Sequence, residues 1–194
     1  MSLSRIVSNY INYGGYINLW KNITKIIQSK HNYNQKTNIC TGGEWYQFPS
    51  HFFLPNNANL EFLYDNFHGQ LPQYYPSNEG TYIEPLQSFN DKNKEEISRY
   101  IHYDKCDYIV ISIPEYTQYE IDTMIDSFRI VEKLIIKQSK VWIQVSNQLI
   151  IDLLRSTSSF ARAFYLPGLS STKNIYKKYS IYKKENKEDS NEFN

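Results

Sequence analysis

Two pairs of carboxylates offer the simplest acid–base chemistry in this sequence. Glu95 and Glu96 are adjacent, and Asp104 and Asp107 lie on either side of Cys106. A group transfer needs a general base that takes up the proton of the attacking hydroxyl. Neighbouring residues of a helix point about 100° apart, so Glu95 and Glu96 cannot both face one substrate. We therefore expect these two residues to form the solvated start of a helix rather than a catalytic pair.

The cysteines decide the redox chemistry. Cys40 and Cys106 each lie beside a predicted strand, and an oxidising compartment would allow one disulfide between them. The alternative is that both are small buried apolar residues, as free cysteines often are. We expect no metal site, because the cysteines and the scattered histidines lack zinc-ligand spacing; the histidines are His31, His51, His68 and His102.

The best-known signatures of nucleophilic and phosphate-binding sites are missing. The sequence has no GxSxG elbow, and the Gly pair at 42 and 43 is not followed by the residues of a P-loop or a dinucleotide fingerprint. The most unusual segments are instead NICTGGEWYQFPSHFFLPNN at 38–57 and FHGQLP at 67–72. Both are too irregular for a plain helix or strand, so side-chain packing must hold them. Such segments usually build a shaped surface.

Four blocks of the sequence resemble the C-terminal segment of glycosyltransferase family 22, in particular its endoplasmic-reticulum α-1,2-mannosyltransferase of N-glycan precursor assembly. In chain order the blocks are NICTGGEWYQFPSHFFLP from Asn38, FHGQLP from Phe67, NDKNKEEISRYIHYDKCDYIV from Asn90 and ARAFYLPGLS from Ala161. The chain departs from the family pattern at His68, where the family has Arg, and at Ile97, where it has Pro. Because His cannot reproduce the charged five-donor fork of Arg, a charge-based role at position 68 is in doubt.

The resemblance implies the activity and its surroundings. Members transfer mannose from dolichyl-phosphate-mannose, in α-1,2 linkage, to the dolichol-linked oligosaccharide, and this chain looks like the luminal part that follows the last membrane helix. The family's acidic motif has no counterpart in these 194 residues. The resemblance therefore implies a segment that is inactive alone, holds no cofactor, and works in the endoplasmic-reticulum membrane with an absent catalytic membrane module. Its start suggests a truncated gene model, and the alternative is a free-standing carbohydrate-binding or scaffold domain.

Several residues of the matching blocks could hold a substrate. An aromatic ring against a sugar, flanked by amide and carboxylate hydrogen bonds, is the usual grip on a polysaccharide, and Glu44, Trp45, Tyr46 and Gln70 supply these groups. Alternatively, the aromatic residues are wedges that dock the domain onto the membrane module: Trp45, Phe48, Phe52 and Phe53.

Basic residues and a sequon complete the set of candidates. Arg99, beside Tyr100, and Arg162 could each hold a phosphate or a sugar, although a salt bridge that pins a loop is commoner. Asn22, Ile23 and Thr24 form an N-glycosylation sequon within a predicted helix.

Composition narrows the class of protein. The 194 residues suit one domain, and 21 Lys and Arg against 20 Asp and Glu give a net charge of +1. That charge is too small for nucleic-acid binding by counterion release, so we expect no nucleic-acid partner. No apolar run approaches the ~18 residues of a membrane helix, and we expect a soluble chain.

The periodicity predicts an α/β or α+β layer domain: a small mixed sheet with packed helices and long irregular aromatic and Pro-rich loops. Residues 3–29 fit two amphipathic helices separated by Gly14 and Gly15. Further helices are expected at the NDKNKEEISRY segment, at 119–137 and at LIIDLLRS, and strands at 38–40, 59–64, 107–113, 140–145 and 174–184. We expect a helical lead-in over 1–29, one domain over 30–184 and a disordered tail over 185–194.

Overall fold

The computed structural model describes residues 2–29, 35–42, 51–65, 68–72, 92–112, 130–137, 141–151 and 158–185. The α-helices among these residues are α1 (Ser2–Ser29), α3 (Ile130–Lys137), α4 (Ser159–Ala163) and α5 (Leu169–Lys173). Three short 3-10 helices are η2 (His51–Phe53), η4 (Ile97–Arg99) and η5 (Tyr103–Lys105). The strands are β1 (Thr37–Thr41), β2 (Ala58–Leu63), β3 (Tyr100–Ile101), β4 (Tyr108–Ser112), β5 (Trp142–Ile151) and β6 (Tyr176–Lys184).

The strands form one mixed sheet in the order β3-β2-β1-β4-β6-β5, which confirms the predicted fold class. The first four strands of this order are parallel, while β6 runs antiparallel to β4 and β5 runs antiparallel to β6. In the order β3-β2-β1-β4, the strands β2 and β3 are added on one side of β1 and β4 is added on the other side. The order in which the strands are added therefore reverses between β1 and β4. Ligands of open α/β sheets commonly bind at the carboxyl ends of strands beside such a point.

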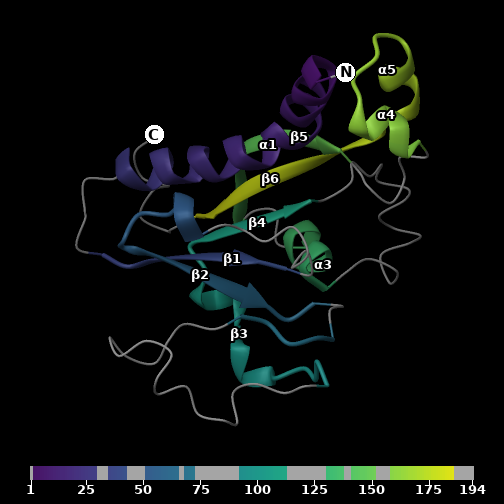
Figure 1. The fold of residues 1–194 in the computed structure, drawn as a ribbon. Helices are drawn as coiled ribbons and strands as arrows, with labels where there is room; N and C mark the ends of the chain where they lie inside the picture. The colour runs from purple at the N-terminus through teal and green to yellow at the C-terminus, as the bar shows by residue number, and fades with distance from the viewer. Residues whose placement is uncertain are drawn as a thin grey trace, which may run out of the picture.

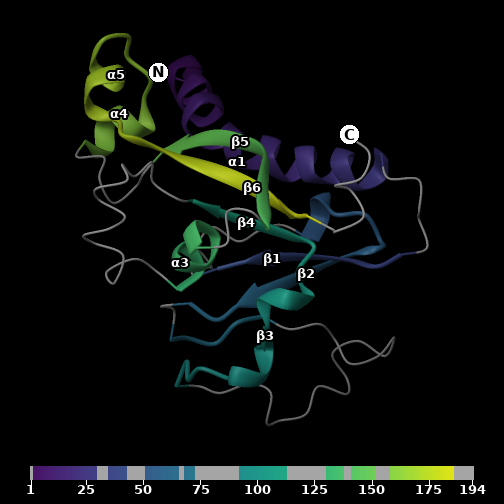
Figure 2. The ribbon, with the colours of Figure 1, turned by 180° about the vertical axis from the view of Figure 1, so that it is seen from behind.

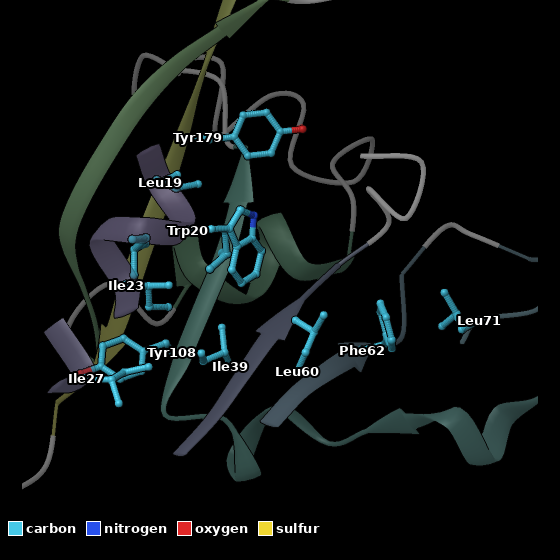
Figure 3. Close-up of a cluster of buried hydrophobic side chains, with 12 residues drawn as sticks. Leu19, Trp20, Ile23, Ile27, Ile39, Leu60, Phe62, Leu71, Tyr108 and Tyr179 are labelled. Carbon is cyan, nitrogen blue, oxygen red and sulfur yellow. The ribbon is translucent and has the colours of Figure 1, made fainter. Parts of the chain in front are cut away.

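Helices cover both faces of the sheet (Figures 1 and 2). The second half of α1 packs on one face, where Leu19, Trp20, Ile23 and Ile27 meet side chains of β1, β2, β4 and β6 (Figure 3). On the other face, Val131 and Ile135 of α3 pack with side chains of β1 and β4. Because β4 lies between these layers, all five of its residues are buried, as a central parallel strand requires.

The predicted helix pair over 3–29 is wrong, because α1 is one continuous helix through Gly14 and Gly15. A glycine inside a helix costs about 1 kcal/mol relative to alanine but keeps its backbone hydrogen bonds, so it need not end the helix. Figures 1 and 2 instead show α1 bending along its length. Glycine pairs are among the usual sites of such bends.

The first half of α1 lies beside α4 and α5 and beyond the sheet (Figures 1 and 2). We call residues 2–17 together with residues 158–175 the lobe. Ser4 joins its two parts, since its hydroxyl donates to the carbonyl of Tyr165 at 2.8 Å and its own carbonyl accepts from Tyr165 N–H at 3.1 Å. Gly168, at the start of α5, has a φ of 84°, which favours glycine.

A buried polar network centred on Asn12 completes the lobe. The Asn12 amide donates to the Ser8 hydroxyl at 2.8 Å and to the Arg162 carbonyl at 3.1 Å. Its Oδ1 accepts from the Tyr176 hydroxyl at 2.7 Å and from Asn174 Nδ2 at 3.5 Å. The start of α1 is therefore fixed by hydrogen bonds rather than by apolar packing.

Two further expectations fail locally. The helix expected from Asn90 is only the 3-10 turn η4 among the described residues, and Asn93 has a φ of 49°, a left-handed conformation that no right-handed helix accepts. Residues 149–151, expected in a helix, instead extend β5. The strands expected near 38–40, 59–64, 107–113, 140–145 and 174–184 are confirmed as β1, β2, β4, β5 and β6. The expected domain limits and disordered tail stay predictions.

Candidate functional site

The two aromatic and Pro-rich segments leave the sheet from neighbouring strands. β1 and β2 are parallel and in register from Thr37 with Ala58 to Thr41 with Phe62, so the residues that follow them start at the same edge. A Cβ added to Gly42 would lie 3.0 Å from Val131 Cγ2 and 3.1 Å from Asp65 Oδ2. Glycine therefore lets the end of β1 pass between α3 and the buried Asp65. Sequence reasoning did not single out Asp65.

The central residues of the first segment, Glu44, Trp45 and Tyr46, lie outside the described residues, as does Phe48. Phe52 and Phe53, the two remaining candidates for docking onto the membrane module, differ in exposure. Phe52 is 87% exposed, whereas Phe53 is half-buried against the α1 core. The Thr24 hydroxyl donates to the Phe53 carbonyl, and Lys21 Nζ lies 5.9 Å from the Phe53 ring centroid. The end of the segment is thus anchored on α1, with Phe52 left on the surface.

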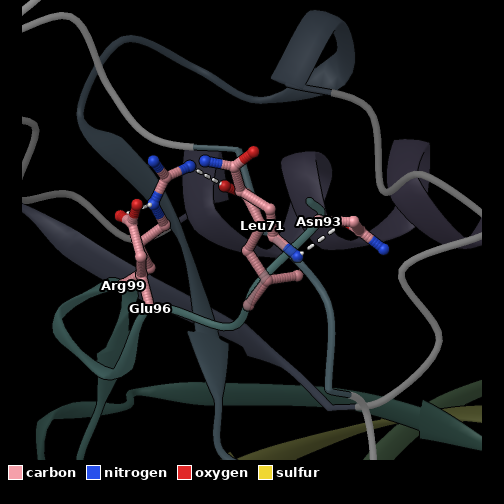
Figure 4. A network of polar contacts seen from close by, with 5 residues as sticks. Leu71, Asn93, Glu96 and Arg99 are labelled. Carbon is pink, nitrogen blue, oxygen red and sulfur yellow. Dashed lines mark hydrogen bonds and ion pairs between the residues drawn. The ribbon is translucent and has the colours of Figure 1, made fainter. Parts of the chain in front are cut away.

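The FHGQLP segment is pinned to residues 93–100 by polar contacts (Figure 4). The backbone N–H of Gln70 donates to Asn93 Oδ1 at 2.9 Å. The Arg99 guanidinium donates to the Leu71 carbonyl and, through Nε, to Glu96 Oε2 at 2.7 Å. Two of the four matching blocks therefore form one surface unit at the β3 edge of the sheet, which we call the polar cluster.

A second set of contacts extends the polar cluster. His68 Nδ1 lies 3.1 Å from Glu95 Oε2, and the Tyr100 hydroxyl donates to Glu95 Oε1 at 2.9 Å. The hydrogen bond from His68 lowers the pKa of Glu95, so this carboxylate stays ionised. Burial, reinforced by Glu95, raises the pKa of the Tyr100 hydroxyl, which therefore stays a donor. The arrangement positions the segment, with Glu95 as the acceptor shared by His68 and Tyr100.

The predicted site residues are only partly brought together. Gln70, Arg99 and Tyr100 share the polar cluster, while Arg162 belongs to α4 in the lobe. The Arg99 side chain is only 5% exposed and engages the chain itself. The guanidinium of Arg99 therefore fixes the FHGQLP segment. This is the alternative to substrate binding that the sequence analysis gives for Arg99, a salt bridge that fixes a loop.

The adjacent carboxylates take roles that the sequence analysis missed. Glu95 pairs with His68 and Glu96 with Arg99, so each holds a different residue of the polar cluster. The matching blocks contain residues of opposite charge, which could have indicated these pairs. The assumption that Glu95 and Glu96 are neighbours on one helix hid them. Elsewhere, Asp107 Oδ2 accepts from the Asn38 N–H at 2.8 Å and so fixes the start of β1. In the part of the chain that the structure describes, no three His, Cys, Asp or Glu residues gather as a metal site would require.

Cys40 and Cys106 form a disulfide. Cys40 lies in β1 and Cys106 just before β4, and both side chains are buried beneath α3. The bond ties the segment that returns from β3 to the middle of the parallel sheet. Asn22, the sequon residue, is half-buried within α1.

No helix among the described residues is both long and apolar enough to span a bilayer. This observation concerns the described helices alone.

Comparisons with known proteins place the chain beside one set of enzymes. It is 36% identical over 190 residues to human α-1,2-mannosyltransferase ALG9, an alignment that covers 94% of this chain and 29% of the human protein. The Caenorhabditis elegans relative algn-9 is 31% identical over 202 residues, covering 96% of this chain and 31% of that protein. The Schizosaccharomyces pombe relative alg9 is 36% identical over 141 residues, covering 69% of this chain and 22% of that protein.

No family model and no solved structure matches the chain. The chain spans less than a third of the length of the curated relatives it matches. The similarity extends over nearly all of this chain and includes the segment at 38–57, FHGQLP and the ARAFYLPGLS block. This chain therefore belongs to the ALG9 family of α-1,2-mannosyltransferases.

Proposed function

We propose that this chain is the lumen-facing C-terminal part of an endoplasmic-reticulum α-1,2-mannosyltransferase that acts in N-glycan precursor assembly. The observation that carries the proposal is the similarity to the ALG9 proteins over 94% of the chain. In this proposal the whole enzyme takes mannose from dolichyl-phosphate-mannose and adds it to the dolichol-linked oligosaccharide. The reacting carboxylate belongs to the membrane module, so this segment alone is inactive.

The disulfide supports the luminal placement. Disulfides persist in oxidising compartments such as the endoplasmic-reticulum lumen and are rare in the cytosol. The Cys40–Cys106 bond is buried and joins two elements of the parallel sheet. A buried structural bond of this kind fits a domain that folds in the lumen.

The geometry supports a positioning role. The segments that follow β1 and β2 start at the carboxyl ends of these neighbouring strands, and the polar cluster fixes Gln70 and Leu71 of FHGQLP by hydrogen bonds. An acceptor held there would meet the catalytic module at a raised effective concentration. The proposed contacts are the rings of Trp45 and Tyr46 against a sugar, with hydrogen bonds from Glu44 and Gln70.

A chimera tests the assignment. This chain replaces the matching segment of the human relative in cells that lack that enzyme, and the lengths of the lipid-linked oligosaccharides are measured. We expect the chimera to restore extension, while the human protein without the segment and this chain alone both fail. Extension by the chain alone would contradict the claim that the reacting carboxylate lies elsewhere. A chimera that is intact and located in the membrane but inactive would contradict the assignment itself.

The same chimera separates acceptor binding from bracing of the membrane module. If the segment grips the acceptor, Trp45→Ala and Gln70→Ala raise KM for the lipid-linked acceptor and leave kcat nearly unchanged. Leu149→Ala, at an exposed position of β5, is the matched control and should change neither value. An unchanged KM in both variants would leave bracing as the role of the segment.

A further inference from the structure

The buried face of α1 changes character halfway along the helix. In the second half, the side chains that face the sheet are apolar, namely Leu19, Trp20, Ile23 and Ile27. In the first half, the inward residues are Ser4, Ser8 and Asn12, which bond to the 158–176 segment. The start of α1 is therefore polar on the side that faces its own domain.

The outward face of the same half is apolar. Leu3, Ile6, Tyr10, Tyr13 and Ile17 follow one another at spacings of three and four, which places them within an arc of about 80°. Their exposed fractions range from 39% to 75%. We call these five residues the apolar stripe. A helix that faced water here would carry polar residues instead, as α1 does one turn later at the exposed Lys21.

The segments that form the lobe, together with the rest of α1, carry basic residues and no acidic ones. Residues 2–29 and 158–175 contain Arg5, Lys21, Lys25, Arg162 and Lys173 but not one of the 20 acidic residues of the chain. The 158–175 part of the lobe also exposes Phe160, Leu166 and Leu169. Exposed apolar and aromatic residues can insert at the boundary of the acyl chains, and basic residues without acidic neighbours attract anionic lipid headgroups.

We propose that the lobe rests on a phospholipid bilayer, with the apolar stripe inserted at the boundary between headgroups and acyl chains. Lys21 and Lys25, both exposed in the second half of α1, are the cations proposed to meet the lipid phosphates. A second copy of the chain is the less suitable occupant, because self-association would bring two cationic lobes together without acidic partners. The polar network around Asn12 holds the first half of α1 at its angle to the sheet and so presents the stripe.

This inference goes beyond the proposed function and stands without it, because it depends only on the residues of the lobe and on Lys21 and Lys25 of α1. The vesicle test below uses the isolated chain and no sugar, so failure of one proposal leaves the other unaffected.

Flotation with lipid vesicles tests the proposal. The purified chain is mixed with phosphatidylcholine vesicles, with or without phosphatidylinositol. We expect binding to both and tighter binding when the anionic lipid is present. Ile6→Gln/Tyr10→Gln should weaken binding to both vesicles by at least about tenfold, because two inserted side chains lose their apolar contact. Lys21→Gln/Lys25→Gln should remove most of the gain from phosphatidylinositol while binding to pure phosphatidylcholine stays the same.

A matched pair on β5 controls for general stickiness. Ile143 and Leu149 are 46% and 61% exposed outside the lobe, so Ile143→Gln/Leu149→Gln should bind like the unmodified chain. Circular dichroism and urea unfolding verify that each variant is folded. A Tyr10→Trp reporter should be quenched by brominated lipids, and a Leu149→Trp reporter should not. Absence of vesicle binding, equal loss in the β5 pair, or a dimer that dissociates in Ile6→Gln/Tyr10→Gln would overturn the proposal.

Discussion

Cys40 in β1 and Cys106 ahead of β4 are joined by a disulfide across 66 residues, with their Cα atoms 5.8 Å apart. A bridge that closes a loop of this length restricts the unfolded chain, which stabilises a domain by roughly 2–4 kcal/mol. We predict that reductant lowers the free energy of unfolding by this amount, as measured by urea denaturation. Cys40→Ala/Cys106→Ala should be equally destabilised and insensitive to reductant. Identical urea midpoints with and without reductant in the unmodified chain would contradict the prediction.

The network around Asn12 gives a second prediction. Asn12→Ala removes the acceptor of the part-buried Tyr176 hydroxyl and one of the two partners of both Asn174 Nδ2 and the Arg162 carbonyl, which should cost about 1–3 kcal/mol. Asn9→Ala, at an exposed position of the same helix, is the control and should change stability by less than about 0.5 kcal/mol. Urea unfolding of both variants tests this prediction. Equal free energies of unfolding for Asn12→Ala and Asn9→Ala would mean that the network contributes little.

Ile97 begins η4, and a proline there should be accepted. The first residue of a 3-10 helix needs no hydrogen-bond acceptor for its N–H, and its φ lies near the value that proline fixes. The preceding Glu96 is already extended, with φ −119° and ψ 109°, as a residue before proline prefers. We predict that Ile97→Pro raises the free energy of unfolding by about 0.4–1 kcal/mol.

Ser98→Pro is the matched control for that substitution. It would place Ile97, a residue of η4, before a proline, where helical backbone is disfavoured. Thermal unfolding should show the two variants shifting in opposite directions, and a common loss of stability would refute the argument.

The pairing of Glu95 with His68 makes part of the stability depend on pH. The pKa of Glu95 is lowered in the folded state by the hydrogen bond from His68. Its contribution is therefore present above the ordinary pKa of a glutamate, about 4.3, and is lost as the pH falls through the lowered value. We predict that the difference in unfolding free energy between the unmodified chain and Glu95→Gln shrinks on acidification below pH of about 4.

His68→Ala is the companion variant, because His68 is the main cause of the lowered pKa. It should reduce the acid dependence as Glu95→Gln does. Urea midpoints at neutral and acidic pH give the comparison, and a difference that grows as the pH falls would have the wrong sign.

The sequence predicted the parts of the fold that follow from apolar periodicity. Ile109 and Ile111 face α3 while Tyr108 and Val110 face α1, so the short run that contains them had to be a central strand. Apolar periodicity does not predict the backbone conformation of single residues. The pair Gly14 and Gly15 predicts a break, although a long helix tolerates both residues. The periodicity also does not predict the positive φ of Asn93, which interrupts the expected helix.

The candidate site was predictable as a set of segments but not as a set of contacts. The resemblance marked FHGQLP and the residues around Arg99 separately, and only the structure shows that Arg99 reaches the Leu71 carbonyl. The polar inner face of α1 escaped notice because its partners lie more than 150 residues away in the sequence. Contacts at such separations leave no periodic pattern.

The sequon at Asn22 gives the last prediction. Ile23 is fully buried, and the Thr24 hydroxyl oxygen lies 3.0 Å from the Trp20 carbonyl oxygen and also contacts the Phe53 carbonyl, so the sequon is held inside a helix rather than in a surface loop. We predict that Asn22 stays unmodified when the chain is passed through the secretory pathway of mammalian cells with an added signal peptide. Leu149→Thr creates a control sequon at Asn147 on the exposed strand β5, and this site should be glycosylated. Endoglycosidase treatment followed by mass spectrometry distinguishes the two, and a mass loss from the unmodified chain that Asn22→Gln abolishes would show that the sequon is used before α1 packs.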